Sequence, residues 1–332
     1  MARVRNLWNR TKKVALIWTV SAIAFYCMFQ MALRNASRNS PTIPSGNRSP
    51  CSRFRKLWCI LYATDSPISN SERRSRLYDK LARDLDEKGA LFLNQGETSQ
   101  SLSLSDLFTL KDGVVTPILK AVDPPVRANV LHLSTEYSLP ISEAVRNIVV
   151  PYFDKAIWLQ NSSLYHFSMF HASHHIAPVP AGELEIETEA NAVKAVTECL
   201  CPLTIVLDRV VLTSTGVLLG CWQVVSGTDP ITVRAKLKTA LPRAPEKQLY
   251  DAAMLHTSFA RLLGRPSTLP AEVDKVSELH FFHELVNRLN SQIHGMQATV
   301  SELWYVEEFD VLALALNGRM KVRQFQLGCS KT

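Results

Sequence analysis

The spacing of apolar positions along the chain predicts an alternation of helices and strands. Leu77, Leu81 and Leu85 recur at helical intervals with charged residues between them, so residues 71–88 are expected to form an amphipathic helix. Further helices are expected at residues 139–156, 183–200, 231–241 and 270–293. Strands are expected at residues 129–133, 163–170, 204–213, 217–225, 253–263, 297–305 and 311–327, where β-branched and aromatic residues are frequent. This mixture predicts a body of the α+β class.

The expected elements occur in a repeated order. A strand, a helix and a pair of strands follow one another from residue 163 to residue 225, and again from residue 253 to residue 327. Ser214-Thr-Gly216 marks the turn of the first strand pair, and Asn317-Gly318 marks a turn in the second. Two copies of one arrangement predict two lobes that pack as a pseudo-symmetric pair.

The residues before this body differ from it in character. Val14 to Leu33 is a run of twenty residues without a formal charge, which as a helix crosses the roughly 30 Å hydrocarbon core of a bilayer. We therefore expect a basic N-terminus and transmembrane anchor at residues 1–34, followed by a flexible stem at residues 35–70. The alternatives for the apolar run are a buried core helix, a cleaved signal peptide and an organellar transit segment.

The charge is distributed unevenly along the chain. The formal charge of +7 alone suggests a nucleic-acid-binding surface, but residues 1–64 hold eleven Lys and Arg and no Asp or Glu, so the rest is net negative. The basic residues before the apolar run favour a cytosolic N-terminus and a translocated body. We expect a single-pass protein of the ER and Golgi type, with an organelle such as the mitochondrion as the alternative. Asn161 begins a glycosylation sequon within the body.

The seven cysteines show no CxxC spacing, so the sequence predicts neither a disulfide framework nor a zinc knuckle. Cys51 and Cys59 can pair if the body is lumenal. Cys199 and Cys201 are expected to be small buried apolar residues.

A short motif begins each copy of the repeat. It reads His-x-Ser-apolar, with His166 and Ser168 in the first copy and His256 and Ser258 in the second. Residues i and i+2 of a strand point to the same face, so each motif places one imidazole beside one hydroxyl group. If the lobes face each other, two imidazoles and two hydroxyls meet across a groove.

This set of side chains suits a phosphodiester. One neutral histidine can take a proton from an attacking water or hydroxyl group, and one protonated histidine can donate a proton to the leaving oxygen. Imidazole titrates near neutral pH, so both forms are expected to be accessible without large pKa changes. The serine hydroxyls can hydrogen-bond the non-bridging oxygens.

With these motifs and their flanks, residues 128–328 resemble the 2H phosphoesterase superfamily, also described as the RNA ligase/cyclic nucleotide phosphodiesterase family. Members carry two His-x-Thr/Ser-apolar motifs, and here the first continues to the aromatic Phe170 while the second continues through Ala260 to Arg261. The resemblance implies a two-lobed fold with antiparallel sheets lining a central groove. It also implies a hydrolase or ligase that needs no metal or cofactor and acts on a 2′,3′-cyclic phosphate or a related nucleotide or RNA-end phosphodiester.

The resemblance implies that His166, Ser168, His256 and Ser258 are catalytic. Arg261 is expected to be a phosphate or structural contact, although strict alternation along the strand puts it on the face opposite His256 and Ser258. We expect a monomer with an accessory segment at residues 71–127 and a 2H phosphoesterase-like domain at residues 128–332.

Other interpretations of the same residues stay open. His166 and His256 are alternatively core histidines, and the protein is alternatively a non-catalytic, membrane-tethered module that binds a nucleotide or RNA end. Three further histidines, His171, His174 and His175, follow the first motif, but no carboxylate or cysteine lies nearby at ligand-like spacing. We therefore expect no metal site and place these three residues on a loop or at the rim of the groove. Tyr165 and Phe167 are expected in the core, because they face away from His166.

Overall fold

The computed structural model describes residues 68–94, 103–111, 114–153, 156–268, 274–311 and 316–329. The expected membrane span at Val14–Leu33 and the Cys51–Cys59 pair lie outside the described residues and stay predictions. Among the helices formed by the described residues, none combines the length and the apolar composition needed to cross a bilayer.

Helices and strands alternate broadly as the sequence predicts. The helices are α3 (Asn70–Lys88), α4 (Leu104–Leu107), α5 (Thr135–Phe153), α6 (Glu183–Thr197), α7 (Pro230–Ala240) and α8 (Lys275–Ile293), with short 3₁₀ helices η1 (Leu91–Asn94) and η2 (Ser162–Leu164). The strands are β1 (Phe108–Lys111), β2 (Val114–Pro117), β3 (Lys120–His132), β4 (Ile157–Leu159), β5 (His166–Ser173), β6 (Leu203–Leu212), β7 (Val217–Ser226), β8 (His256–Leu262), β9 (Gln297–Val300), β10 (Glu302–Val311) and β11 (Met320–Gln326). The five helices expected from the sequence are therefore confirmed, with ends that differ by a few residues.

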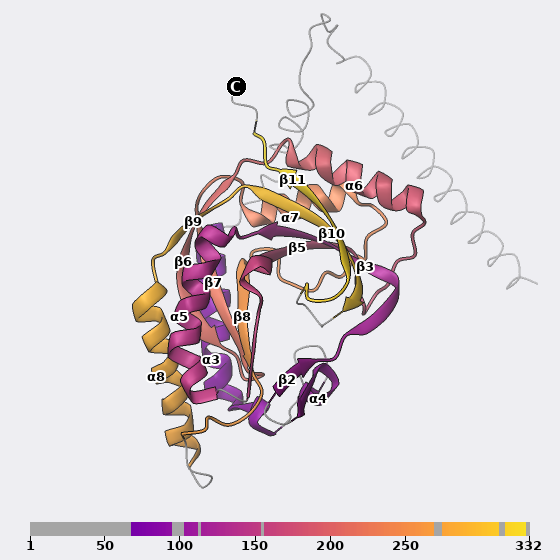
Figure 1. Cartoon of the computed structure of the whole chain (residues 1–332). Helices are drawn as coiled ribbons and strands as arrows, with labels where there is room; N and C mark the ends of the chain where they lie inside the picture. The colour runs from indigo at the N-terminus through magenta and orange to yellow at the C-terminus, as the bar shows by residue number, and fades with distance from the viewer. Residues whose placement is uncertain are drawn as a thin grey trace, which may run out of the picture. The chain divides into compact units, whose positions relative to one another are not determined.

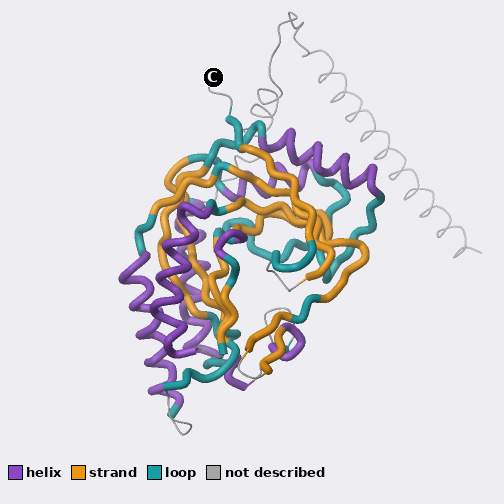
Figure 2. Tube along the Cα trace, in the orientation of Figure 1, coloured by secondary structure: helices purple, strands orange, loops and turns teal. Residues whose placement is uncertain are grey.

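The described strands form two large antiparallel sheets and a separate β1–β2 hairpin (Figures 1 and 2). The first sheet has the strand order β11-β10-β3-β5, and the second sheet has the order β4-β8-β7-β6-β9. His166 begins β5 in the first sheet, and His256 begins β8 in the second. The mixed α+β class with antiparallel sheets is therefore confirmed.

Each copy of the sequence repeat contributes to both sheets. The hairpin β6–β7 follows β5 in the chain but lies in the second sheet, where β7 pairs with β8. The hairpin β10–β11 follows β8 in the chain but lies in the first sheet, where β10 pairs with β3. Each sheet therefore combines strands from both copies of the repeat. In this arrangement the two motif strands, β5 and β8, lie alongside each other.

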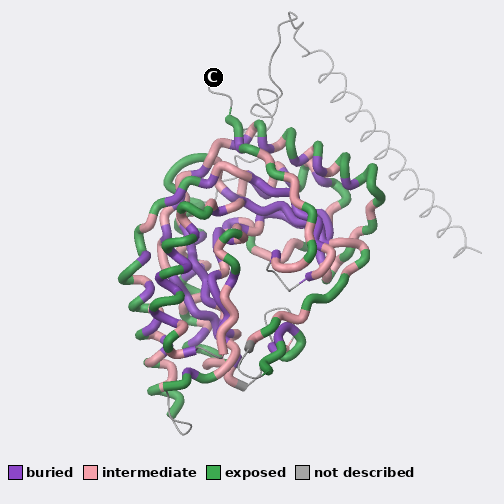
Figure 3. Tube along the Cα trace, in the orientation of Figure 1, coloured by how far each residue is buried: buried purple, intermediate pink, exposed green. Residues whose placement is uncertain are grey.

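Helices cover the sheets on their outer sides. α5 and α8 pack together against the second sheet, and their apolar residues join the main core (Figure 1). α6 and α7 lie side by side, with α7 against β5 and α6 against β10 and β11 (Figure 1). Buried positions accordingly run along the central strands and on the inward sides of these helices (Figure 3). Tyr165 and Phe167 are buried in this core, as predicted.

α3 covers the opposite face of the second sheet. Ser69 caps its N-terminus by accepting a hydrogen bond from the Glu72 N–H, and Leu77 and Leu81 pack with Leu219 of β7. The buried Tyr78 hydroxyl donates to the carbonyl oxygen of Trp222 or Leu255 and accepts from the Leu255 N–H. α3 therefore belongs structurally to the second lobe, next to the start of β8.

β3 is longer than the strand expected at residues 129–133, and it runs across the expected boundary between residues 127 and 128. Its pairing with β10 shifts register between Val126 and Ala121, where Pro124 and Pro125 lie. Proline cannot donate a ladder hydrogen bond, which accounts for the irregular pairing at this point of β3.

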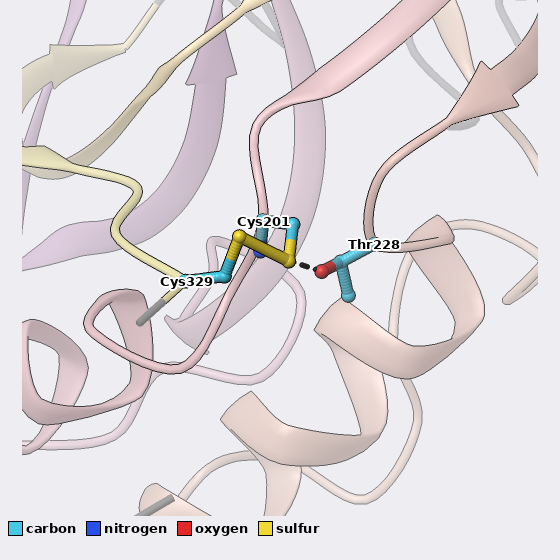
Figure 4. Close-up of a disulfide and its surroundings, with 3 residues drawn as sticks. All are labelled: Cys201, Thr228 and Cys329. Carbon is cyan, nitrogen blue, oxygen red and sulfur yellow. Dashed lines mark hydrogen bonds between the residues drawn. A yellow bond between two sulfur atoms is a disulfide. The ribbon is translucent and has the colours of Figure 1, made fainter. Parts of the chain in front are cut away.

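A disulfide joins Cys201, just before β6, to Cys329, just after β11, with 4.5 Å between their Cα atoms (Figure 4). The Cys201 N–H donates to Thr228 Oγ1 at 2.7 Å. The expectation that Cys199 and Cys201 are only small buried apolar residues is wrong, since both are disulfide-bonded. The partner of Cys201 is 128 positions away, and sequence spacing gives no sign of such a pairing.

Candidate active site

The first motif lies at the start of β5, and a bulge extends the face that carries it. His166 and Ser168 pair with alternate residues of β3 and so share one side of the first sheet, as expected. The register then shifts and leaves Met169 as an extra residue. As a result His171, paired with Ala128, returns to the face of His166 and Ser168. The expectation that His171 lies on a loop or rim is therefore wrong, since it is a buried strand residue.

The second motif lies at the start of β8 and is also followed by a bulge. His256, Ser258 and Arg261 pair with Cys221, Leu219 and Val217, which are alternate residues of β7 and face one side of the sheet. Phe259 is the extra residue that shifts the register. The expectation that Arg261 faces away from His256 and Ser258 is wrong for this reason, and all three side chains share one face.

Arg234 of α7 ties the two motif segments together. Its guanidinium donates to the carbonyl oxygens of Ser168 at 2.8 Å and Met169 at 3.0 Å in β5. It also donates to the carbonyl oxygens of Ala252 at 2.6 Å and Met254 at 2.7 Å, just before β8. The side chain is only 7% exposed, so these four bonds fix the distance between the motif strands from inside the protein.

Tyr250 lies between the two motifs. Its ring contacts the His256 imidazole edge to face, with 4.8 Å between the ring centroids, and its hydroxyl is hydrogen-bonded to Ser168. Burial raises the pKa of Tyr250, while the nearby Arg261 and Arg234 oppose that rise. The tyrosine is therefore neutral and connects the first serine to the second histidine.

The hydrogen bond of His166 sets its tautomer. Nδ1 lies 2.7 Å from the carbonyl oxygen of Leu164, and a carbonyl oxygen can only accept, so Nδ1 carries the proton. Burial lowers the pKa of His166 to about 4, with a smaller contribution from His132 in the same direction. The neutral ring consequently leaves Nε2 with a free lone pair.

His256 is held neutral as well. Burial lowers the pKa of His256 to about 3, and the positive charge of Arg234 and the neighbouring His166 add to this effect. The expectation that both histidines titrate near neutral pH without large pKa changes is therefore wrong for the ligand-free site. Sequence alone does not reveal how deeply the two imidazoles are buried.

A pocket opens against the first sheet and begins at the first motif. Its lining residues are Val126, Ala128, Val130, His166, Ser168, His171, His174, His175, Leu249, Glu308, Val311 and Leu316. His256, Ser258 and Arg261 lie outside this lining, on the second sheet, and the pocket is lined instead by Glu308 of β10 across from the first motif. His174 and His175 line the pocket, and His174 is buried, so it is not the rim residue that the sequence suggested.

Arg261 is a buried cation with unused hydrogen-bonding capacity. Burial lowers its pKa to about 10, and its Nη1 has no hydrogen-bond partner. It faces the same side of the second sheet as His256. The arrangement offers a positive charge to an anion near the second motif.

Sequence reasoning missed Arg234, Tyr250 and Glu308, since none of them lies in a motif and each acts through contacts with distant segments. One signal was available for the second bulge. Gly220 lies inside β7, and a Cβ there would overlap the ring of Phe259. A glycine within a strand often marks such a close approach.

No group of three or more His, Cys, Asp or Glu side chains among the described residues has an arrangement that could hold a metal ion. Among the histidines after the first motif, His174 is engaged through its ring, which bonds the Lys247 carbonyl oxygen and the Ala177 N–H.

Several solved structures are similar to this chain. TT0787 of Thermus thermophilus has 13% identity and a TM-score of 0.40, over 61% of this chain and 98% of that chain. Escherichia coli LigT complexed with NADP+ has 13% identity and a TM-score of 0.36, over 62% of this chain and 99% of that chain. A structure described as a phosphoesterase has 14% identity and a TM-score of 0.35, over 62% of this chain and 99% of that chain. No family model and no curated protein matches this chain.

Proposed function

We propose that this chain is a metal-independent phosphodiesterase that opens 2′,3′-cyclic phosphates or related RNA-end phosphodiesters by two-histidine acid–base catalysis. The hydrogen bond from His166 Nδ1 to the carbonyl oxygen of Leu164, at 2.7 Å, carries the proposal. It fixes the neutral tautomer whose Nε2 accepts a proton, and His166 lines the pocket beside Ser168.

In the proposed reaction, a water oxygen bonds to phosphorus while His166 Nε2 takes the proton from that water. The bond from phosphorus to the 2′ or 3′ oxygen breaks, and this oxygen takes a proton from protonated His256. The product is a phosphomonoester beside a free hydroxyl group. Exchange with solvent then removes the proton from His166 and restores the proton of His256. Ser168 and Ser258 are proposed to hydrogen-bond the non-bridging oxygens as charge builds there.

Binding of the substrate is proposed to favour protonation of His256. Without a ligand, burial and Arg234 hold the pKa of His256 at about 3. A phosphodiester anion beside the ring favours the charged imidazolium and thereby raises this pKa. The positive charges of Arg234 and Arg261 support anion binding in a body that is net negative overall.

The test is hydrolysis of 2′,3′-cyclic nucleotides by the full chain in EDTA. His166→Ala and His256→Ala should each lower kcat by roughly 10²–10⁴-fold, which is the usual contribution of one proton transfer. His294→Ala, at an exposed position after α8, is the control and should keep full activity. Full activity in both motif variants would contradict the proposal, and loss of wild-type activity in EDTA would point to a metal instead.

The strongly lowered histidine pKa values favour a second candidate, a non-catalytic module that holds a nucleotide or RNA end in the same site. Such a module needs no protonated histidine. Calorimetry that detects nucleotide binding by the wild-type chain, with no turnover of any cyclic phosphate, would support the module over the enzyme.

We also propose that the body lies in an oxidising compartment behind an N-terminal membrane anchor. The Cys201–Cys329 disulfide supports this, because disulfides are rare in the reducing cytosol. Asn161 is exposed, and its Oδ1 accepts hydrogen bonds from the N–H and hydroxyl of Ser163, so the amide nitrogen is accessible for glycosylation. A glycosidase-sensitive mass shift that Asn161→Gln abolishes would support lumenal topology, and disulfide-free protein from cells would contradict it.

A further inference from the structure

The pairing of β7 with β8 is irregular at the residue before the second motif. Trp222 and Leu255 follow the Cys221–His256 pair, and the Trp222 N–H donates to the carbonyl oxygen of Leu255 at 3.0 Å. In a regular antiparallel pair the Leu255 N–H would donate in return to the carbonyl oxygen of Trp222. It donates instead to the hydroxyl of Tyr78, at 3.2 Å, and β8 begins only at His256.

The hydroxyl of Tyr78 occupies the place of this second ladder bond. It lies 2.7 Å from the carbonyl oxygen of Trp222 and 2.8 Å from that of Leu255, and it donates its single hydrogen there. Tyr78 is fully buried, and burial raises the pKa of its hydroxyl, so the group keeps this hydrogen. A side chain of α3 therefore bridges β7 and the residue before His256 at the point where the two strands separate.

α3 also holds the chain segment that leads into β8. Arg73 donates to both carboxylate oxygens of Asp251, at 3.3 and 3.2 Å, and Asp251 accepts a hydrogen bond from the Ala253 N–H at 2.8 Å. Arg234 of α7 bonds two carbonyl oxygens of the same segment. Residues 251–255 are therefore held by both α3 and α7.

α3 in turn contacts the start of α7. The buried Arg74 donates to Asp229 at 2.9 Å, and Asp229 caps α7 by accepting a hydrogen bond from the Ile231 N–H. Arg74 also donates to Gln223 of β7 at 3.0 Å. Because α7 carries Arg234, α3 helps to place the helix that spans the two motifs as well as the segment before the second motif.

We propose that Tyr78 is a positioning residue for the second motif, because its hydroxyl fixes the point at which the chain enters β8. His256 directly follows Leu255, so a shift of the Leu255 backbone moves the His256 imidazole. The inference rests on the proposed function, which assigns to His256 the role of proton donor. α3 precedes residues 128–328, which carry the family resemblance, and the proposal makes it a part of the active-site architecture of this chain.

The test is Tyr78→Phe, which removes one oxygen atom and keeps the ring that packs with Leu219 and Cys221. The Leu255 N–H and the carbonyl oxygen of Trp222 then lose their partner, so the backbone before the motif shifts. kcat for 2′,3′-cyclic nucleotides should fall about three- to thirtyfold, since proton transfer depends steeply on the position of the donor. KM should stay within about twofold, because the change affects the chemical step.

Tyr305→Phe is the matched control. Tyr305 is also fully buried, and its hydroxyl donates to Glu189 of α6 at 2.8 Å. Each variant loses one buried hydroxyl, so each should melt about 3–10 °C below the wild type, and kcat is measured below both transitions. Tyr305→Phe should keep the wild-type kcat. Equal losses of kcat in the two variants, or a wild-type kcat in Tyr78→Phe, would overturn the proposal.

A spectroscopic measurement separates this inference from the proposed function. In the full chain with isotope-labelled histidine, the His256 ring resonances are identified by their absence in His256→Ala. If the wild type hydrolyses no cyclic phosphate, the proposed function fails, but these resonances still report the surroundings of the imidazole. A shift in Tyr78→Phe that Tyr305→Phe does not produce supports the positioning role. Unchanged His256 resonances in Tyr78→Phe reject it, whether or not the chain is active.

Discussion

The guanidinium of Arg234 donates a hydrogen bond to the carbonyl oxygen of Ser168 at 2.8 Å. Arg234 lies on helix α7, outside both motif strands. The same nitrogen reaches the carbonyl oxygen of Met254, two residues before His256. One side chain therefore sets the spacing between the two motifs. In the proposed reaction the spacing between the two motifs limits which phosphodiester they can act on together, and Arg234 then has a positioning role.

Arg234→Met should lower both stability and kcat. Four buried carbonyl oxygens lose a donor, and each unsatisfied group costs about 1–3 kcal/mol, so the free energy of unfolding should fall by about 3 kcal/mol or more. Urea unfolding measures this change. Arg234→Lys keeps the charge and part of the donor set, so it should be intermediate in stability.

A purely structural role for Arg234 predicts a different kinetic result. In that case the folded Arg234→Lys protein, assayed at a temperature below its unfolding transition, would have the kcat of the wild type. A positioning role predicts a lower kcat with little change in KM. Arg83→Met, at an exposed position of α3, is the control and should change stability by less than about 0.5 kcal/mol.

Arg261→Met should weaken phosphate binding and leave the fold intact. The bulge at Phe259 places Arg261 on the face of His256 and Ser258, and its Nη1 is unpaired. Loss of a charge-assisted hydrogen bond of about 1.5–3 kcal/mol corresponds to a rise of about ten- to a hundredfold in KM. An unchanged KM together with a large loss of stability would show that Arg261 serves the fold alone.

His171 should make the protein sensitive to acid. Burial, with help from His174, His175, His166 and Arg234, lowers its pKa to about 3 in the folded state, against an ordinary value of about 6.5 in the unfolded chain. Between these pH values the unfolded chain binds more protons, so stability is complete above about pH 6.5 and is lost as the pH falls.

His171→Leu removes this proton linkage. The dependence of unfolding free energy on pH should become shallower between pH 6 and pH 4, by up to about 1.4 kcal/mol per pH unit. Urea unfolding at a series of pH values measures the slope. His294→Gln removes an exposed imidazole and should leave the slope unchanged. Parallel curves for wild type and His171→Leu would contradict the expected linkage.

The sequence was sufficient to locate the motifs on strands. The His-x-Ser spacing placed His166 with Ser168 and His256 with Ser258, because alternation over two residues does not depend on the rest of the sheet. The order of elements also followed from apolar spacing. The exchange of hairpins between the two sheets could not be predicted from this spacing, since periodicity within a segment does not show which strand it pairs with.

The bulges limited what alternation could predict beyond the motifs. An extra residue at Met169 brings His171 onto the site face, and one at Phe259 does the same for Arg261. Glu308 lies in a strand whose sequence is not distinctive, and its burial with Oε1 unpaired could not be predicted from that sequence. Such features depend on tertiary contacts.

The disulfide has a topological consequence for the intact molecule. Because Cys201 and Cys329 are linked, the chain between them forms a closed covalent loop that contains β8 and the second motif, while the first motif lies on the chain before it. A protease that cuts once anywhere inside this loop opens the ring but releases no fragment. His166 and His256 would then remain on one covalently joined, two-chain molecule, and only after a cut between Cys201 and His256 would reduction of the disulfide end their covalent connection.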